Sequence, residues 1–366
     1  MSVHHAKRID FIDLLEFLAM TLVLLYHCTT YDFNILESAS VSVLLGYYFR
    51  AILSAGVPLF FFANGYLLFS RESILKKHVH KTIRLIILTV IWGFINVLLL
   101  MPIEGQHLSG REIIHAVWSW KSGWINHFWF LGVLICLHFI FPVLKTTFDT
   151  NKKAFYYFVA VCAVMTFGNQ FICAAGTVAA HILIGYPEQI KDNVFNMFNP
   201  FRGSYWWYAL VYFCGGGIAH LLVPYISAHQ RKANWTAALS IPLSMLLLAV
   251  WGCFLSRLQG SVWDHVWGGY DSVFTLINVA AFFVLSVNYS SKRNIVHRFI
   301  ELVSRNTLGI FFIHEIFIHL TNLQVNMMPP AQNIIGNIIY TAVILLASLF
   351  SAMVIKSIPI LQKLLV

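Results

Sequence analysis

Three ionisable residues lie on one apolar segment near the N-terminus, in the stretch DFIDLLEFLAMTLVLLYH, residues 10–27. On a helix Glu16 and His27 are 11 positions apart, close to three full turns, so they share a face, and Asp13 lies one turn before Glu16. Histidine suits general-base catalysis near neutral pH, and an ionisable residue within so apolar a helix is a functional candidate. His27 is therefore a candidate base. The alternative is a histidine that bonds to a neighbouring helix.

The acids and the histidine are expected at different depths of this helix. At about 1.5 Å per residue, His27 lies roughly 16 Å beyond Glu16 along the axis. The sequence therefore places Asp13 and Glu16 near the end where the chain enters the helix, and His27 toward the other end. Acidic residues also favour a helix N-terminus, so Asp10 and Asp13 are equally consistent with a simple helix start.

The composition indicates the surroundings in which these residues must work. Hydrophobic residues make up 59% of the 366 residues and charged residues 11%, with a mean hydropathy of +0.73. Soluble domains carry roughly 25% charged residues, so a soluble fold is excluded. The six cysteines form no CxxC pair, which argues against a zinc site or a disulfide framework. We expect an all-α polytopic membrane protein forming one domain over residues 1–366, without a metal.

Ten apolar segments are long enough to cross a membrane, which takes about 20 residues. They are 11–30, 43–69, 84–102, 128–147, 154–175, 206–226, 235–256, 271–289, 306–322 and 334–358. A kink is expected at Pro58 in the second segment, and the stretch VAAHILIG, residues 178–185, is consistent with a short re-entrant piece. The first segment has no cleavage site and is expected to be retained as a signal anchor.

The distribution of basic residues predicts the orientation. With ten spans, 18 of the 24 Lys and Arg residues fall on the side of the N-terminus. The positive-inside rule then predicts that both termini are cytoplasmic, in a multi-pass protein of the cell membrane. The net charge of +9 is explained by this topology. We therefore expect membrane lipids as partners and no nucleic acid.

Several short motifs, taken in order, resemble the acyltransferase-3 family. Arg8 and Asp13 followed by His27 resemble the family's opening helix, and GVPLFFFANGYLL, residues 56–68, resembles its second. The basic pair Lys81 and Arg84, placed on a cytoplasmic loop, resembles a later landmark. HFWFLGVLICLHFIFPVL, YFCGGG and NTLGIFFIH, starting at residues 127, 212 and 306, continue the resemblance over nearly the whole chain. These are integral-membrane acyltransferases that mostly modify bacterial surface glycans.

The resemblance implies roles for particular residues. It implies His27 as the catalytic base, and we group Asp13 and Glu16, on the same helix face, with it as catalytic candidates. Lys81 and Arg84 are candidate contacts to the phosphates of acyl-CoA, and His314, Trp129 and Asn64 are candidate substrate contacts. Asn64 is equally consistent with a hydrogen bond between helices. The basic cluster around Lys81 is also what the positive-inside rule alone would produce, and His314 is equally consistent with packing between helices.

One position departs from the family pattern. The family usually carries arginine eleven residues before the histidine, where this chain has Glu16. Lys81 or Arg84 is then expected to supply the missing cation by pairing with Glu16. Otherwise the residues of the active site are arranged differently, or the chain is a relative without catalytic activity.

Aromatic residues gather around two loops on the side opposite the termini. They are Trp118, Trp120, Trp124 and Trp129, and then Tyr205, Trp206 and Trp207. Such residues form the interfacial belt of membrane proteins, and they also suit a platform for sugar rings.

Two functions of different classes remain open at the level of sequence. The first is transfer of an acyl group, expected to be acetyl, from cytoplasmic acyl-CoA to a hydroxyl of a sugar, glycan or lipid-linked sugar. The second is export of a polysaccharide or lipid-linked glycan. No inverted repeat is apparent in the sequence, which weighs against the common transporter architectures.

Overall fold

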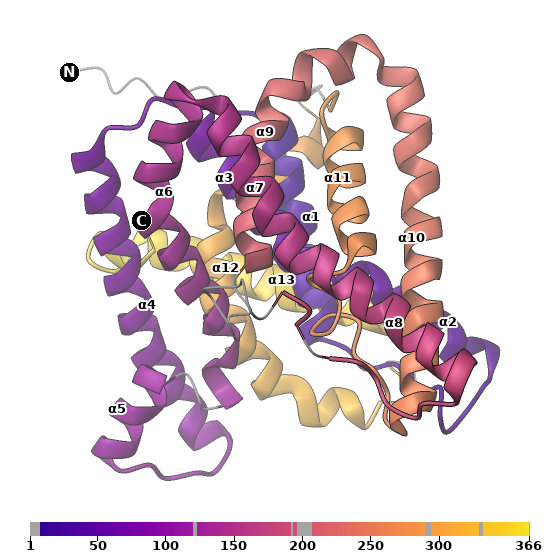
Figure 1. The fold of residues 1–366 in the computed structure, drawn as a ribbon. Helices are drawn as coiled ribbons and strands as arrows, with labels where there is room; N and C mark the ends of the chain where they lie inside the picture. The colour runs from indigo at the N-terminus through magenta and orange to yellow at the C-terminus, as the bar shows by residue number, and fades with distance from the viewer. Residues whose placement is uncertain are drawn as a thin grey trace.

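The computed structural model describes residues 8–119, 123–191, 193–195, 207–289, 294–328 and 332–365. All regular secondary structure in these residues is helical, which confirms the predicted fold class (Figure 1). The helices are α1 (Asp10–His27), α2 (Val41–Leu53), α3 (Gly56–Phe69), α4 (Leu75–Ile103), α5 (Gly110–Ser119), α6 (Trp129–Thr150), α7 (Lys152–Ala163), α8 (Asn169–Ile184), α9 (Trp207–Ala228), α10 (Gln230–Gln259), α11 (Val273–Ser286), α12 (Ile295–Asn326) and α13 (Ile334–Ser357). Short helical turns cover Gly123–Phe128, Val164–Gly168 and Leu361–Leu364.

Seven helical stretches of the described chain are long and apolar enough to cross a membrane. They are Val41–Phe69, Leu75–Ile103, Gly110–Thr150, Lys152–Ile184, Trp207–Ala228, Gln230–Gln259 and Ile334–Ser357. The three other predicted spans correspond to α1, α11 and α12. Helix α11 has only 14 residues, and the apolar character of α1 and α12 is lowered by the acids and histidines they carry. The chain is thus a multi-pass membrane protein, and the count of ten stays a prediction.

Three local expectations are corrected. The break in the second predicted span lies at Ser54 and Ala55, because Pro58 falls in the first turn of α3, where a missing N–H costs nothing. VAAHILIG is not a re-entrant piece, since α8 continues through Ile184. Lys81 and Arg84 lie on α4 and not on a loop, because Lys and Arg are good helix formers and extend the helix beyond its apolar part.

The glycine motifs of the sequence serve close packing between α3 and α9. A Cβ on Gly65 would lie 1.8 Å from the carbonyl oxygen of Phe213, and one on Gly216 would lie 2.0 Å from that of Phe62. Either distance is far inside van der Waals contact, so only glycine fits at these positions. Small residues of this kind let membrane helices approach closely. This packing fixes the core against which α1 lies.

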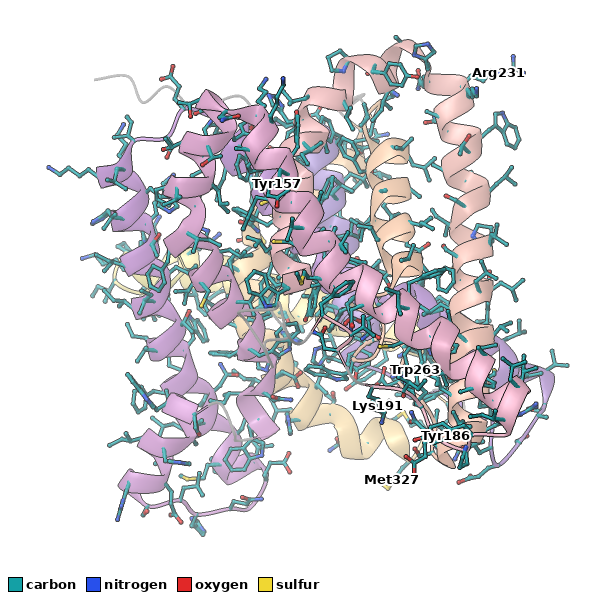
Figure 2. All side chains as sticks on the ribbon, in the orientation of Figure 1. Tyr157, Tyr186, Lys191, Arg231, Trp263 and Met327 are labelled. Atoms are coloured by element: carbon teal, nitrogen blue, oxygen red, sulfur yellow. The ribbon has the colours of Figure 1, made fainter. Side chains whose placement is uncertain are left out.

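Helix α1 lies inside the bundle, in contact with α2, α3, α11, α12 and α13. The α3–α4, α6–α7 and α9–α10 connections gather at one end of the bundle, which we call the basic end (Figure 1). The α4–α5 and α10–α11 connections lie at the other end, the distal end. Figure 2 shows Arg231 at the basic end and Tyr186, Lys191 and Trp263 at the distal end. The basic residues Lys7, Lys121, Arg202, Lys292 and Arg293 and the aromatic residues Trp120, Tyr205 and Trp206 lie outside the described residues.

Candidate active site

His27 is the last residue of α1, and its side chain meets an acid from α12. The Nδ1 atom of His27 lies 2.6 Å from Oε1 of Glu315. Glu315 is 9% exposed, so this contact is shielded from bulk water. A hydrogen bond from Nδ1–H to the carboxylate fixes the tautomer of the ring and leaves the lone pair on Nε2. That arrangement is the one a histidine base requires.

Three further histidines surround Glu315. His314 Nε2 lies 3.6 Å from Oε1 of Glu315, and His319 Nε2 lies 3.9 Å from its Oε2. The ring of His127, from the turn before α6, is centred 5.2 Å from that of His314 and 6.3 Å from that of His27. We call these four histidines and Glu315 the histidine cluster. Among the described residues, no Lys or Arg forms an ion pair with Glu315.

The buried members of the cluster have nitrogen atoms without partners. His314 Nδ1 lies 2.8 Å from the carbonyl oxygen of Phe311, which can only accept, so the proton is on Nδ1 and the lone pair on Nε2. No hydrogen-bond partner within the described chain meets His314 Nε2 or His127 Nε2. Buried polar atoms are normally paired. His127 lines the cavity that borders this cluster, so its Nε2 is available to a substrate group or a water molecule, whereas His314 lies in the protein interior.

A cavity of about 310 Å³ borders this cluster, and we call it the His27 cavity. His27, His127 and Glu315 supply its imidazole and carboxylate side chains. Trp129, Trp267 and Tyr270 supply aromatic walls, with the Trp129 ring centred 5.5 Å from that of Trp267 and 5.7 Å from that of Tyr270. Aromatic faces beside hydrogen-bonding groups are typical of sugar-binding sites. Trp129, a substrate contact predicted from the sequence, lines this cavity, and its role stays a prediction.

A second cavity, of about 450 Å³, opens nearer the basic end, and we call it the Lys81 cavity. Its cationic lining comes from Lys81, Arg84 and Arg305. Asn64 lines it too, although its amide nitrogen bonds only to Phe60 O, 3.0 Å away within α3, among the described residues. Leucine side chains of α4, α6 and α12, together with Met20, Phe60, Phe130 and Phe311, form its apolar wall.

The two cavities share a wall. Phe130 from α6 and Phe311 from α12 line both of them. The cation-lined and the histidine-lined spaces are therefore neighbours, separated by two aromatic side chains. A third cavity, of about 730 Å³ between α8 and α10, is almost wholly apolar and contains none of the predicted site residues.

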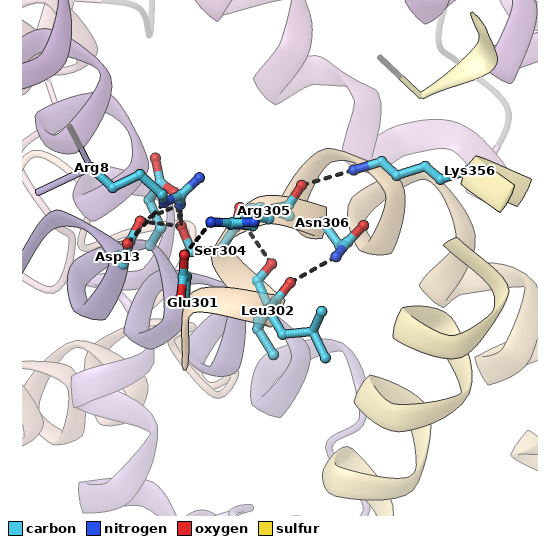
Figure 3. Close-up of polar contacts among 11 residues, drawn as sticks. Arg8, Asp13, Glu301, Leu302, Ser304, Arg305, Asn306 and Lys356 are labelled. Carbon is cyan, nitrogen blue, oxygen red and sulfur yellow. Dashed lines mark hydrogen bonds and ion pairs between the residues drawn. The ribbon is translucent and has the colours of Figure 1, made fainter. Parts of the chain in front are cut away.

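Asp13 and Glu16 lie in a separate cluster with Arg8 and Ser304. Figure 3 shows Arg8, Asp13 and Ser304 of this cluster. Arg8 forms an ion pair with Asp13, and its Nη2 also donates to the Ser304 hydroxyl at 2.8 Å. The same hydroxyl oxygen lies 2.8 Å from Oδ1 of Asp13 and 2.5 Å from Oε2 of Glu16. We call these four residues the Ser304 cluster.

The hydrogen-bond count in the Ser304 cluster fixes one proton. A hydroxyl has a single proton and can donate to only one of the two carboxyl groups. Because Arg8 binds both oxygens of Asp13, Asp13 is the ionised acid and accepts from Ser304. Glu16 must then carry a proton and donate to Ser304. A neutral acid explains how Glu16 occupies a position where the family usually has arginine.

The expected pairing of Glu16 with Lys81 or Arg84 does not occur in the described residues. All three line the Lys81 cavity, but Glu16 is hydrogen-bonded to the Ser304 hydroxyl. The structure also keeps Asp13 and Glu16 apart from His27, about 16 Å along α1 for Glu16. His314 lies beside Glu315 but is fully buried and lines neither the His27 nor the Lys81 cavity.

Two residues of the site were not assigned from the sequence. Glu315 was visible only as a neighbour of His314 in FFIHEIF, and its direction toward His27 depends on how α12 packs on α1. His127 precedes the FWF run of α6 and carried no further signal.

Part of this site has residue types that bind metal ions. The nearest ligand atoms of His27, His314 and Glu315 all lie within 4.8 Å of one another. Two ligands of one tetrahedral zinc ion are roughly 3.3 Å apart, from bond lengths near 2.0 Å. The 2.6 Å between His27 and Glu315 is instead a direct hydrogen bond. The contact favours a proton between these two groups, and the prediction of no metal stays a prediction.

Comparison with known proteins identifies the family. Residues 9–356 match the acyltransferase domain family, which covers nearly the whole chain. No curated protein and no solved structure matches the chain significantly. The protein belongs to the acyltransferase-3 family of integral-membrane acyltransferases.

Proposed function

We propose that the protein is a membrane O-acyltransferase that moves an acyl group, acetyl in the simplest case, from cytoplasmic acyl-CoA to a hydroxyl of a sugar or cell-surface glycan. The observation that carries this proposal is the hydrogen-bonded His27–Glu315 pair at the wall of an aromatic cavity. A second, cation-lined cavity lies directly behind that wall.

The Lys81 cavity suits the donor. Its cations, Lys81, Arg84 and Arg305, offer contacts to the phosphates of coenzyme A, and arginine binds phosphate in a bidentate manner. Its leucine walls suit the apolar part of the pantetheine arm. If the basic end faces the cytoplasm, as the distribution of Lys and Arg predicts, this cavity lies on the side where acyl-CoA is made.

The His27 cavity suits the acceptor. A sugar ring can stack on Trp129, Trp267 or Tyr270 while one hydroxyl approaches His27. This cavity lies toward the distal end, which is the outer side if the basic end faces the cytoplasm. A free glycan or a lipid-linked sugar on that side would be an acceptor. The acyl carbon of the donor must reach the hydroxyl past Phe130 and Phe311.

The chemistry is a general-base acyl transfer. His27 Nε2 takes the proton of the acceptor hydroxyl as its oxygen attacks the thioester carbonyl carbon. The carboxylate of Glu315 stabilises the imidazolium that forms, through the Nδ1 hydrogen bond. When the C–S bond breaks, His27 returns the proton to the thiolate. The products are the ester and free coenzyme A, and the enzyme ends in its starting protonation state.

The test is release of coenzyme A by the purified protein in lipid nanodiscs, supplied with acetyl-CoA and a glycan acceptor. We expect acceptor-dependent release that His27→Ala abolishes. His115→Ala, a change at an exposed histidine of α5, serves as the matched control and should leave the rate unchanged. Release by His27→Ala at the wild-type rate, or no release with any acceptor, would contradict the proposal and favour an exporter or a silent relative.

A further inference from the structure

We infer that His319 and Glu104 position the carboxylate of Glu315, and through it the base His27, from the distal end of the bundle. His319 lies one helical turn after Glu315 on α12, and Glu104 caps the C-terminus of α4. The inference rests on the proposed function, because it assigns these two residues to the same reaction. As they lie outside the two substrate cavities, they are positioning residues and not catalytic ones.

His319 lies between two carboxylates. Its Nδ1 is 2.5 Å from Oε1 of Glu104, a direct hydrogen bond. Its Nε2 is 3.9 Å from Oε2 of Glu315, a separation that a small rotation closes or a water molecule bridges. Glu315 therefore meets His27 with one oxygen and His319 with the other. His314 Nε2 also lies 3.6 Å from Oε1, so imidazoles face both oxygens of the carboxylate, and His319 restricts its rotation from the side of Oε2.

Helix α4 also holds α12 on the other side of Glu315. The Trp92 ring stacks on Phe312 with centres 5.1 Å apart, and Asn96 Nδ2 donates to the Phe312 carbonyl oxygen at 3.0 Å. These contacts and the Glu104–His319 bond bracket Glu315 along α12. Loss of the Glu104–His319 hydrogen bond would leave α12 without this contact to α4 on the distal side of Glu315.

The charges around Glu315 come from groups that can gain or lose a proton. His27 faces it from α1, His127 from the turn before α6, and His314 and His319 from α12 itself. Tyr340 from α13 and the thiol of Cys28 lie further off. Glu104 forms an ion pair with His319. His319 and Glu104 have side chains 25% and 36% exposed, against 12% for Glu315, so water reaches the outer pair more readily.

The inference predicts the direction of a measurable change. In the wild type, His319 and His27 together balance the negative charge of Glu315. Replacing Glu104 with glutamine weakens the hold of His319 on its proton, so His27 becomes the main partner of Glu315 and keeps its own proton to higher pH. A simple loss of one negative charge near the cluster would move the titration of His27 the other way, to lower pH.

The experiment measures the modification of His27 by diethyl pyrocarbonate, which reacts with neutral imidazole, in the full-length protein in nanodiscs. Mass spectrometry follows the peptide that contains His27 as a function of pH. We expect the midpoint to rise by on the order of one pH unit in Glu104→Gln and His319→Gln. Glu112→Gln, a change at an exposed acid of the neighbouring helix α5, is the matched control and should leave the midpoint unchanged.

Steady-state release of coenzyme A from acetyl-CoA gives a second readout. Glu104→Gln should lower kcat about tenfold with an unchanged KM for acetyl-CoA, and Glu104→Asp should restore most of the loss. An unchanged or lowered His27 midpoint in Glu104→Gln would overturn the inference. The modification of His27 needs no acceptor, so its midpoint can be measured even if the wild type transfers no acyl group. Absence of acyl transfer by the wild type would overturn the proposed function and not this inference. Glu104 is a surface residue, so its variants keep the inference testable if His319→Gln fails to fold.

Discussion

Helices α1 and α12 meet through polar side chains at two places, and the two places are built differently. Near the basic end, Ser304 of α12 meets Asp13 and Glu16 of α1, and at the distal end Glu315 meets His27. Glu16 and His27 are 11 residues apart on α1, and Ser304 and Glu315 are 11 apart on α12. Two helices that run in the same direction thus repeat their contact after about three turns, roughly 16 Å.

The difference between the two contacts is the kind of charge each contains. The Ser304 cluster has a permanent cation, Arg8, and its bridging hydroxyl forms hydrogen bonds to all three other members of the cluster. The histidine cluster has only imidazoles as possible cations, and buried nitrogens remain without partners in the described residues. A saturated cluster holds helices together, whereas a cluster with free lone pairs can take a proton from a substrate. We therefore propose that the first contact serves stability and that the second serves catalysis.

The largest effect is expected from breaking the distal contact. Glu315→Gln keeps the shape of the side chain but removes the charge that stabilises protonated His27. We expect kcat to fall by about 10²–10⁴-fold, the range of general acid–base catalysis, with little change in thermal stability. Coenzyme A release under saturating donor and acceptor measures it. A loss below about threefold would remove Glu315 from the mechanism.

Breaking the contact at the Ser304 cluster should show the opposite pattern, a loss of stability with little loss of activity. Ser304→Ala leaves two buried carboxyl groups without the hydroxyl between them and should destabilise the protein by about 1–3 kcal/mol. The kcat of the folded fraction should change little. Denaturant unfolding of the nanodisc-embedded protein measures the first quantity. Ser240→Ala, whose hydroxyl bonds only within its own helix among the described residues, is the control. A catalytic loss without destabilisation would reverse the assignment.

A smaller effect is expected at the mouth of the Lys81 cavity. Lys81→Ala or Arg84→Ala removes one cation from the proposed phosphate contacts. Each change should raise the KM for acetyl-CoA about tenfold, which corresponds to roughly 1.4 kcal/mol, and leave the KM for the acceptor unchanged. Trp129→Ala supplies the mirror experiment, with a raised KM for the acceptor alone. Equal changes in both constants would show that the two cavities do not separate the substrates.

The smallest effect sharpens the protonation of the Ser304 cluster. If Glu16 is a neutral acid that donates to Ser304, Glu16→Gln replaces an O–H donor by an N–H donor. Stability should then change by less than about 0.5 kcal/mol. Asp13→Asn removes the partner of Arg8 and should cost clearly more, which the same unfolding assay tests. Equal losses for the two variants would mean that Glu16 is ionised.

Much of the fold and part of the site could be predicted from the sequence. Apolar length and the distribution of Lys and Arg indicate a helical membrane protein, because these properties act locally along the chain. The 11-residue spacing placed Glu16 and His27 on one face of α1 at different depths, as the structure has them. The break before Pro58 was misplaced by a few residues, because a proline is tolerated within a first helical turn.

The remainder depends on packing between distant segments. His27 and Glu315 are brought together by α1 and α12, and no local pattern around either residue specifies the other. Ser304 is one serine among many in the sequence, and its role as a bridge appears only when both acids of α1 face it. The sequence therefore assigned a cation to Glu16, whereas the structure provides a hydroxyl and a shared proton.

A double-mutant cycle on His27 and Glu315 tests the central claim most directly. Coenzyme A release is measured for the wild type, His27→Gln, Glu315→Gln and the double variant. If the two residues act as one unit through the 2.6 Å hydrogen bond, the double variant loses no more activity than His27→Gln alone. Losses that multiply, so that the double variant is slower than either single variant by the full effect of the other, would contradict the account.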